Sequence, residues 1–339
     1  MLAHSSANPV IIPLMKKVSR AIIIFILASL TTFLFSACNQ KLTKNAENLN
    51  ELSRPVNCRI IQHLAGETCV PQNPQRIIAL HIATLGNLVA LGVKPIGSAT
   101  GYQKSDFPKY FEGKIDGIQS VGDVTQPNLE KILQLKPDLI INLSDDISIY
   151  PLLSKIAPTV QTGWEGPRQW KEHFNFVIKV LGRENASQQA WNHYYHRIRE
   201  LKAALGDRYQ NKKVSYVYVE DSNRPIFISE LKNVFAGSIL NDVGLQRTEL
   251  QDVITPYGYI FIPEEELSKI DGDVIFIGFD GDDEGKTFNK LKQKPLWNTL
   301  KAVQQNHVYI INLSTWRESN LLAADAVIDD LYKYLVKTP

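Results

Sequence analysis

The stretch ENASQQAWNHYYHRIRELKAALGDR, residues 184–208, decides the fold. No proline or glycine interrupts it for about 20 residues, and its apolar residues recur at spacings of four, four, three and four: Ala190, Tyr194, Ile198, Leu201 and Leu205. This spacing places them in one stripe along a helix. Because an α-helix rises 1.5 Å per residue, such a segment spans about 30 Å, roughly the diameter of a small domain. Residues 183–208 are therefore predicted to be a connector helix between two bodies.

Before the connector, short apolar segments alternate with helical patterns. Strands are predicted at 76–80, 94–99, 138–143 and 159–163, and helices at 83–92, 128–136, 147–157 and 169–182. Such alternation indicates a mostly parallel sheet with helices on both faces. Residues 55–182 are thus expected to form an N-terminal lobe.

The same alternation returns after the connector, in residues 209–339. Strands are predicted at 213–220, 225–229, 273–280 and 307–312, and helices at 233–244, 264–270, 287–300 and 321–335. This part is expected to form a C-terminal lobe. The predicted fold class is therefore α/β, with two α/β lobes of mostly parallel sheets joined by a single long helix.

The N-terminus has the order of a secretory signal. The basic segment MKKVSR (15–20) precedes an apolar run at 21–35, which is short for a membrane span because a span needs roughly 20 residues. Residues 1–37 are predicted to be the signal peptide, with Met15 as an alternative start. The chain is then expected to be exported.

The end of this signal, FSAC (35–38), resembles a bacterial lipobox, in which the cysteine is diacylated and becomes the first mature residue. The resemblance implies a lipid anchor at Cys38, and two acyl chains are enough for stable anchoring. Residues 38–54 are polar and are expected to be a flexible tether. The expected location is the periplasmic face of the bacterial inner membrane, or the cell surface. The alternative is an ordinary signal peptide followed by an incidental cysteine.

Two further cysteines lie in NCRIIQHLAGETCVP (57–71). Two strands are predicted around the turn at 64–66, with Cys58 and Cys69 at roughly matching distances from it. Since exported cysteines meet an oxidising compartment, a cross-strand disulfide is expected, with two free thiols as the alternative. Zinc is not expected here because there is no second cysteine pair.

Several segments together resemble the class III solute-binding lipoproteins of ABC importers, of the iron–siderophore and cobalamin type. The segments are PQRIIAL (74–80) with ATLGNLVALGVKPIG (83–97), NLEKILQLKPDLII (128–141), EEELSKIDGDVIFI (264–277) and KPLWNTLKAVQQNHVYIIN (294–312). The resemblance implies a monomer that binds its ligand between two lobes, without a cofactor. It also implies an ABC permease and its ATPase as partners.

Ligand contacts are expected in loops that follow strands, because ligands of open α/β sheets bind outside the carboxyl ends of the strands. These loops contain His81, Tyr102, Asp145, Asp146, Trp164, Arg168, Arg224, Tyr257, Tyr259, Phe279, Trp316 and Arg317. The oxygens of a ferric siderophore already fill the iron shell, so the protein needs only aromatic walls and donors such as arginine. Trp316-Arg317, directly after the strand at 307–312, is the strongest predicted pair. The alternative is a core tryptophan beside a surface arginine.

Two glutamates are expected to meet the permease. In the resembling family, one glutamate on each lobe contacts permease arginines, and Glu130 and Glu265 occupy these positions, with Glu264 or Glu266 as substitutes for Glu265. Such charges fix docking register more than they add affinity. The alternative is a solvated helix face.

Other functions find little support in the sequence. The net charge is only +2 and no basic tract interleaves with aromatic residues, which argues against a nucleic-acid partner. A metal-ion binder would need converging ligands, yet only seven histidines occur, and His193 and His196 are expected on a solvated helix face. No nucleophile elbow, P-loop or dinucleotide fingerprint supports an enzyme. Haem or cobalamin remains the alternative ligand, with Tyr257, Tyr259 or His81 able to ligate haem iron.

Overall fold

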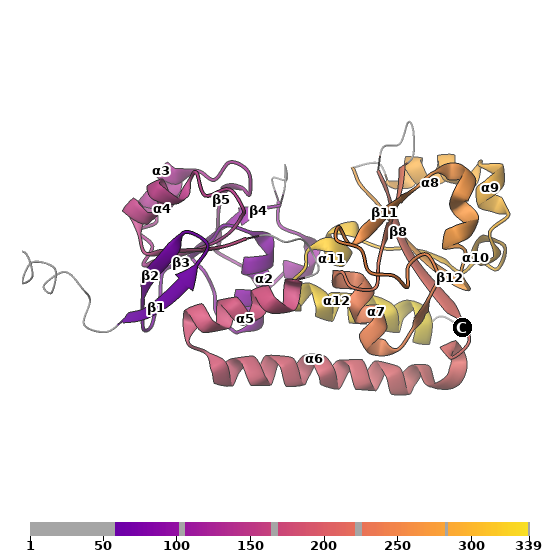
Figure 1. The fold of residues 1–339 in the computed structure, drawn as a ribbon, viewed down its shortest axis with the longest axis horizontal. Helices are drawn as coiled ribbons and strands as arrows, with labels where there is room; N and C mark the ends of the chain where they lie inside the picture. The colour runs from indigo at the N-terminus through magenta and orange to yellow at the C-terminus, as the bar shows by residue number, and fades with distance from the viewer. Residues whose placement is uncertain (1–57, 102–105, 164–168, 221–225, 282–283, 338–339) are drawn as a thin grey trace, which may run out of the picture. The chain divides into compact units, whose positions relative to one another are not determined.

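The computed structural model describes residues 58–101, 106–163, 169–220, 226–281 and 284–337 (Figure 1). The chain divides into two units, residues 1–56 and 57–339, and all described residues belong to the second. The predicted signal peptide, the tether and Cys38 lie outside the described residues. Within the described part of the chain, none of the helices combines the length and the apolarity that a membrane crossing requires.

The first sheet is entirely parallel, as predicted. Its five strands run in the order β5-β4-β3-β6-β7, with bounds β3 (Ile77–Ala79), β4 (Gly97–Thr100), β5 (Gln119–Asp123), β6 (Leu139–Leu143) and β7 (Thr159–Thr162). Its helices are α2 (Ile82–Ala90), α3 (Leu129–Gln134), α4 (Tyr150–Ile156) and α5 (Trp170–Leu181), with a 3₁₀ turn η1 at Lys109–Phe111. β5 is not among the predicted strands.

Helices cover both faces of this sheet, which confirms the prediction. Successive residues of β3 alternate between two apolar clusters: Ile77 packs with residues of α2 and α5, and Ile78 packs with residues of α3 and α4. All five residues of β6 are buried because side chains on both of its faces meet helices.

The second sheet is mixed rather than uniformly parallel. Its main order is β11-β9-β8-β12-β13, and β10 also pairs with β8. The bounds are β8 (Lys213–Glu220), β9 (Ile226–Glu230), β10 (Gln246–Arg247), β11 (Tyr259–Ile262), β12 (Val274–Phe279) and β13 (Val308–Ile310). β9 runs antiparallel to β8 and β11. The reason is local: five residues separate β8 from β9, whereas a parallel crossover needs a dozen or more.

The remaining helices surround this sheet. They are α7 (Phe235–Val243), α8 (Glu284–Lys292), α9 (Pro295–Asn298), α10 (Lys301–Gln304), α11 (Leu313–Arg317) and α12 (Leu321–Leu331), with 3₁₀ segments η3 (Gly206–Tyr209) and η4 (Glu264–Ile270) and a π-type segment η5 (Tyr332–Val336). The predicted helix at 287–300 is therefore two helices, α8 and α9, because Pro295 begins a new helix at its first position.

The connector is the 22-residue helix α6 (Glu184–Leu205), which runs past α5 and α7 (Figure 1). Its buried residues are Tyr194, Ile198, Leu201 and Leu205, which confirms four of the five predicted stripe residues, and Ala190 is half-buried against the same core. The Tyr194 hydroxyl donates a hydrogen bond of 2.7 Å to Asp242 of α7, and Arg197 donates to Asp329 of α12 at 2.6 Å. The Tyr194 ring centre also lies 5.7 Å from that of Trp170 in α5, so α6 contacts a helix that precedes it as well as helices that follow it.

The two cysteines near the N-terminus lie in a hairpin of β1 (Cys58–His63) and β2 (Gly66–Pro71). A disulfide joins Cys58 to Cys69, with the Cα atoms 5.4 Å apart. The strand register differs from the expected one, since Cys69 lies opposite Ile60 and Cys58 lies opposite Pro71. The bridge is therefore diagonal, a geometry that closely spaced strands allow.

Candidate ligand-binding site

The positively charged guanidinium of Arg317 lies over the aromatic ring of Tyr218. Arg317 ends α11, a short helix whose first turn is capped by Asn312, which accepts a hydrogen bond from the Thr315 amide at 3.0 Å. The guanidinium carbon lies 4.6 Å from the centre of the Tyr218 ring, which is a favourable cation–π distance. One Asp280 oxygen lies 3.7 Å from Arg317 Nη1, and 40% of the arginine side chain is exposed. The guanidinium can therefore still meet an anionic ligand.

Trp316 does not share this surface but packs in the core, which is the alternative role, and its ligand contact stays a prediction. The residue is fully buried, its ring centre lies 4.9 Å from that of Phe276, and its Nε1 donates to Asp330 at 2.9 Å. Neighbouring residues of a helix point about 100° apart, so Arg317 faces outward when Trp316 faces the core. Phe279 is also buried, against Phe288, and does not line a surface.

Aromatic side chains extend the surface along the edge strand β11. Tyr259 pairs across the strands with Glu230, and Phe261 pairs with Ile228, which in turn faces Tyr218. Cross-strand partners project from the same face of a sheet, so Tyr259 and Phe261 share the face of Tyr218. Their ring centres are 5.4 Å apart, and 40% of Tyr259 and 57% of Phe261 are exposed.

Tyr257 lies just before this strand and is 75% exposed, so its phenol is accessible. Phe261 was not predicted as a site residue. The signal that could have identified it is the alternation in YIFI (259–262), which places Phe261 on the same face as Tyr259.

Two charged residues lie buried beneath this surface, and neither was predicted. Glu230 is 5% exposed and Arg247 is 6% exposed. Arg247 Nη2 donates to the Glu230 carbonyl oxygen at 3.0 Å and to Gln251 Oε1 at 2.6 Å. Burial raises the pKa of Glu230 to about 7, although Arg317 and Arg247 oppose this, and burial lowers the pKa of Arg247 to about 10.

His81 has a structural role in the first sheet. It is the N-cap of α2, and its Nδ1 accepts a hydrogen bond from the Ala83 amide at 3.0 Å. Burial lowers its pKa to about 4, so the ring is neutral at pH 7. The neighbouring His173 contacts Thr84 at 3.0 Å, and burial together with His81 lowers its pKa to about 3. A ligand contact by His81 stays a prediction.

The other predicted contacts divide into two groups. Asp145 and Asp146 are exposed after β6, and Asp146 accepts a hydrogen bond from the Ser148 amide at 2.8 Å. Four predicted residues lie outside the described residues: Tyr102, Trp164, Arg168 and Arg224.

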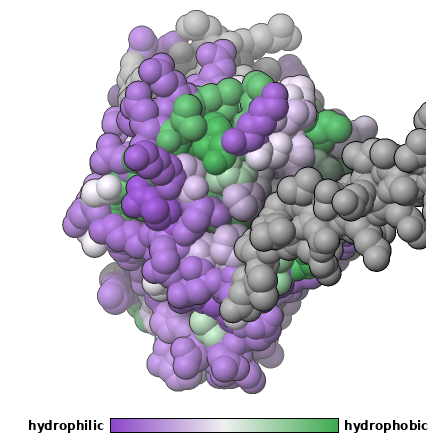
Figure 2. All heavy atoms as spheres, turned by 90° about the vertical axis from the view of Figure 1, so that its left-hand side faces the viewer, coloured by the Kyte–Doolittle hydropathy of each residue, from purple (hydrophilic) through white to green (hydrophobic). Residues whose placement is uncertain are grey.

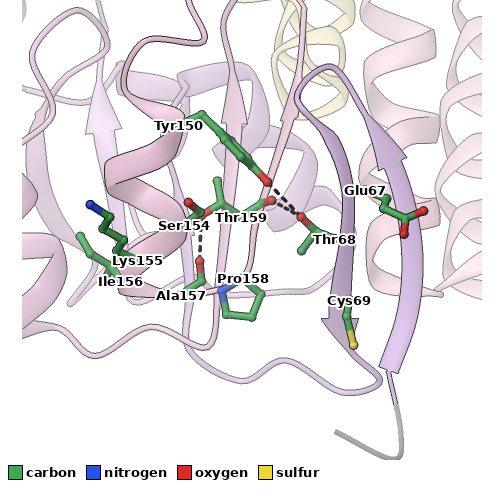
Figure 3. A pocket seen from close by; sticks show the side chains of 10 residues that line it. All are labelled: Glu67, Thr68, Cys69, Tyr150, Ser154, Lys155, Ile156, Ala157, Pro158 and Thr159. Carbon is green, nitrogen blue, oxygen red and sulfur yellow. Dashed lines mark hydrogen bonds between the residues drawn. The ribbon is translucent and has the colours of Figure 1, made fainter. Parts of the chain in front are cut away.

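A groove lies elsewhere on the first sheet, between β2 and the segment joining α4 to β7 (Figure 3). Its polar side chains already bond to one another: Thr68 Oγ1 lies 3.2 Å from the Tyr150 hydroxyl and donates to the Thr159 carbonyl oxygen at 2.8 Å. The groove sits where β7 begins, whereas the ligand loops of such sheets follow the strand ends. It is therefore not the candidate ligand site.

Both predicted docking glutamates are exposed. Glu130 lies in the first turn of α3, and Leu133 on the same helix and Leu152 on α4 expose 58% and 48% of their surface. Figure 2 shows hydrophobic side chains gathered within a hydrophilic surround on this side of the molecule.

The second docking glutamate, Glu265, lies in η4 between two acids that are already paired. Glu264 bonds to Lys294 at 2.9 Å, and Glu266 bonds to Lys269 at 2.7 Å. Among the described residues, Glu265 has no ion pair, which favours it over its two substitutes.

The described residues contain no group of three or more histidine, cysteine or acidic side chains that could hold a metal ion. His196 lies 3.3 Å from Glu200 on the exposed face of α6, as expected. His193 is also exposed, as expected, with 61% of its side chain accessible, and its Nε2 lies 3.4 Å from Asp325 of α12.

Comparisons with known proteins agree with this architecture. A family model described as periplasmic binding protein matches residues 77–313. The probable siderophore-binding lipoprotein YfiY of Bacillus subtilis is 28% identical over 337 residues, which cover 96% of this chain and 100% of YfiY. The Fe(3+)-citrate-binding protein YfmC of Bacillus subtilis is 31% identical over 291 residues, covering 85% and 88%. The crystal structure of Staphylococcus aureus SirA with staphyloferrin B superposes with a TM-score of 0.69 at 26% identity, covering 82% and 98%.

Proposed function

The chain belongs to the periplasmic binding protein family, and from this membership we propose that it captures a ferric siderophore of the hydroxamate or citrate type and delivers it to an ABC permease with its ATPase. Two relatives named for siderophore and ferric-citrate binding support this ligand class. The observation that carries the proposal is the half-exposed Arg317 on Tyr218, beside the exposed rings of β11.

The side chains of this surface can bind the outside of a ferric chelate. Carboxylate and hydroxamate oxygens on the outside of a chelate accept hydrogen bonds from a guanidinium, which offers a planar fork of donors. Tyr257, Tyr259 and Phe261 offer apolar rings to the carbon framework of the chelate. Iron then arrives as cargo inside its chelate, so the protein needs no metal ligands and no cofactor of its own.

The proposal extends to location and chemistry. The protein acts outside the cytoplasm as a monomer, held at the membrane by diacylated Cys38 after removal of residues 1–37. The family consists of substrate-binding proteins, and we propose that this chain likewise catalyses no reaction.

Delivery requires a docking surface, which we assign to Glu130 and Glu265. Both carboxylates are exposed, one on each side of the connector helix in the sequence. The exposed Leu133 and Leu152 beside Glu130 supply an apolar area that a permease loop can cover.

The test is a tryptophan fluorescence titration of the purified mature domain with ferric tris-hydroxamates, ferric citrate, haem and cobalamin. We expect quenching by at least one ferric chelate, and a loss of about 10- to 100-fold in affinity for an anionic chelate in Arg317→Ala, because hydrogen bonds to charged groups contribute about 1.5–3 kcal/mol. Arg183→Ala, an exposed arginine at the start of α6, is the matched control. Quenching by haem or cobalamin alone would support the alternative ligand, and no quenching by any ferric chelate would overturn the proposal.

A further inference from the structure

Glu230 is a carboxyl group buried directly behind the proposed ligand surface. It ends β9, and its cross-strand partner is Tyr259 of the exposed aromatic edge. Only 5% of the residue is exposed, and within the described residues its Oε2 has no hydrogen-bond partner. A buried carboxylate without its full set of hydrogen bonds is costly, so the group gains by becoming neutral.

The charged and titratable groups that interact with Glu230 are Arg317 from α11, Arg247 from β10, and Tyr216 and Tyr218 from β8. The strand register gives the geometry for Arg317: Tyr218 pairs with Ile228, two residues before Glu230 on the same face of the sheet, and the Arg317 guanidinium lies 4.6 Å from the Tyr218 ring. Arg247 already donates to Gln251, to the Val214 carbonyl oxygen and to the Glu230 carbonyl oxygen. The Tyr216 hydroxyl and Arg247 Nη1 are also buried without a hydrogen-bond partner in the described part of the chain.

Arg317 is the cation that links Glu230 to the surface. Although burial lowers the pKa of Arg317, Tyr218 and Glu230 raise it above its ordinary value, so the guanidinium stays charged. An ionised Glu230 would act as its internal counter-charge. Asp280 is a second carboxylate beside Arg317, 3.7 Å from its Nη1, but 47% of its side chain is exposed, so water solvates its charge. An anionic chelate that approaches Arg317 from outside would compete for the same positive charge, and among the negative groups that share this cation the most buried one, Glu230, favours protonation.

We propose that Glu230 is a positioning residue that couples ligand binding to proton uptake: an anionic chelate binds Arg317 as Glu230 takes up a proton from solvent. Affinity for anionic chelates then rises as the pH falls through neutrality, by thermodynamic linkage. A ferric tris-hydroxamate carries no net charge, because three hydroxamate anions balance Fe³⁺, and its affinity stays independent of Glu230. Glu230 thereby sets a pH-dependent preference between charged and neutral chelates. This inference rests on the proposed function.

Burial raises the pKa of Glu230 to about 7, which places the proposed change in affinity near neutral pH. If binding requires the protonated carboxyl, one proton is taken up per ligand well above that pKa. At pH 8 only about one molecule in ten then has Glu230 protonated, so affinity for the anion is about tenfold below its low-pH limit.

The experiment compares the ferric citrate affinity of the mature domain with that of Glu230→Gln from pH 5.5 to 8.5. Glutamine keeps the shape but cannot ionise, and the pH-dependent speciation of ferric citrate cancels in the ratio of the two affinities. We expect near-equal affinities at pH 5.5 and about tenfold tighter binding by the variant at pH 8. Glu249→Gln, whose carboxylate is on the surface, is the matched control and should follow the wild type.

A second measurement covers the case in which Glu230→Gln fails to fold. Calorimetric titration of the wild type with ferric citrate in two buffers of different ionisation enthalpy reports protons taken up on binding. The same titration with a ferric tris-hydroxamate, which carries no net charge, is the reference and should show no proton uptake by Glu230. Binding with no pH-dependent difference between wild type and variant, or no excess proton uptake, would overturn the inference while leaving the proposed function intact. Absence of any ferric chelate binding at every pH would overturn both.

Discussion

The two sheets differ in how completely their strands are covered and how fully their buried polar side chains are hydrogen-bonded. In the first sheet all strands are parallel, helices cover both faces, and His81 serves as a helix cap. In the second sheet an antiparallel edge strand exposes Tyr259 and Phe261. Of the buried side-chain atoms that lack a hydrogen-bond partner in the described residues, two belong to helices of the first sheet and five to residues 216–248 beside the second.

This difference bears on the proposed ligand site. A regular parallel sheet buries its strands completely and leaves few polar groups unsatisfied. The second sheet has two features that lower the stability of the fold: exposed aromatic side chains on its edge strand, and a buried carboxyl group without its full set of hydrogen bonds. Buried ionisable groups with shifted pKa values concentrate at functional sites, because a destabilising group is kept in a protein where its chemistry serves a function. The comparison therefore supports the proposal that Arg317 and its neighbours on the second sheet contact the ligand.

The proposed docking surface takes one glutamate from beside each sheet, and its disruption should have the largest effect. Reversing both charges in Glu130→Lys and Glu265→Lys together is expected to remove nearly all uptake of ferric chelate by cells. Binding by the purified protein should be unchanged, because both carboxylates are exposed and, among the described residues, neither forms an ion pair with Arg317. Uptake of iron-labelled chelate and fluorescence titration measure the two effects separately.

Uptake by each single variant, Glu130→Lys or Glu265→Lys, shows whether one glutamate contributes more to docking than the other. Glu249→Lys, a reversal at another exposed acid, should leave uptake at the wild-type level. Uptake that survives the double reversal would show that the permease meets a different surface.

Substitutions of two adjacent residues beside the second sheet distinguish a residue that stabilises the core from one that contacts the ligand. Trp316→Ala is expected to lower the free energy of unfolding by about 3–5 kcal/mol, because it empties a buried aromatic position and leaves Asp330 without its donor. Arg317→Ala should change stability by less than about 1 kcal/mol, since its side chain is partly exposed. Denaturant unfolding of both variants gives the comparison. A stable Trp316→Ala that fails to bind chelate would support Trp316 as a contact residue.

Much of the fold follows from periodicity. The stripe of Tyr194, Ile198 and Leu201 identifies α6, and the continuous apolar run of β6 identifies a strand buried on both faces. These patterns are local, so the sequence displays them directly. The direction of β9 depends instead on the length of one short link, and β5 (QSVGD) has too few apolar residues to stand out as a strand.

The site is predicted less well, because side-chain direction depends on elements that the sequence does not reveal. Residues 313–317 were expected to be a loop, and their helical form turns Trp316 inward and Arg317 outward. Glu230 and Arg247 look like surface charges in the sequence. Their burial depends on Gln251, which accepts hydrogen bonds from Arg247 and donates to strands β8 and β9. Such long-range networks leave no periodic signal.

The pH dependence of stability should differ in sign between the two sheets, with an effect of about 1–3 kcal/mol for each group. His81 and His173 have pKa values lowered to about 4 and about 3, so their contribution is complete above 6.5, the ordinary value, and is lost as the pH falls towards those values. Glu230 has a pKa raised from 4.5 to about 7, so its contribution is complete below 4.5 and is lost as the pH rises to about 7. Denaturant unfolding from pH 5 to 8 measures both.

Two substitutions test whether His81 and Glu230 cause these opposite changes of stability with pH. His81→Asn keeps a good N-cap but cannot titrate, so it should lose less stability than the wild type between pH 7 and pH 5. Glu230→Gln should lose less than the wild type between pH 5 and pH 8. If both variants kept the wild-type pH profile, the charge burial that distinguishes the two sheets would have no energetic consequence. If only Glu230→Gln changed the profile, the buried charge of the second sheet would be the one that matters, as its place behind Arg317 requires.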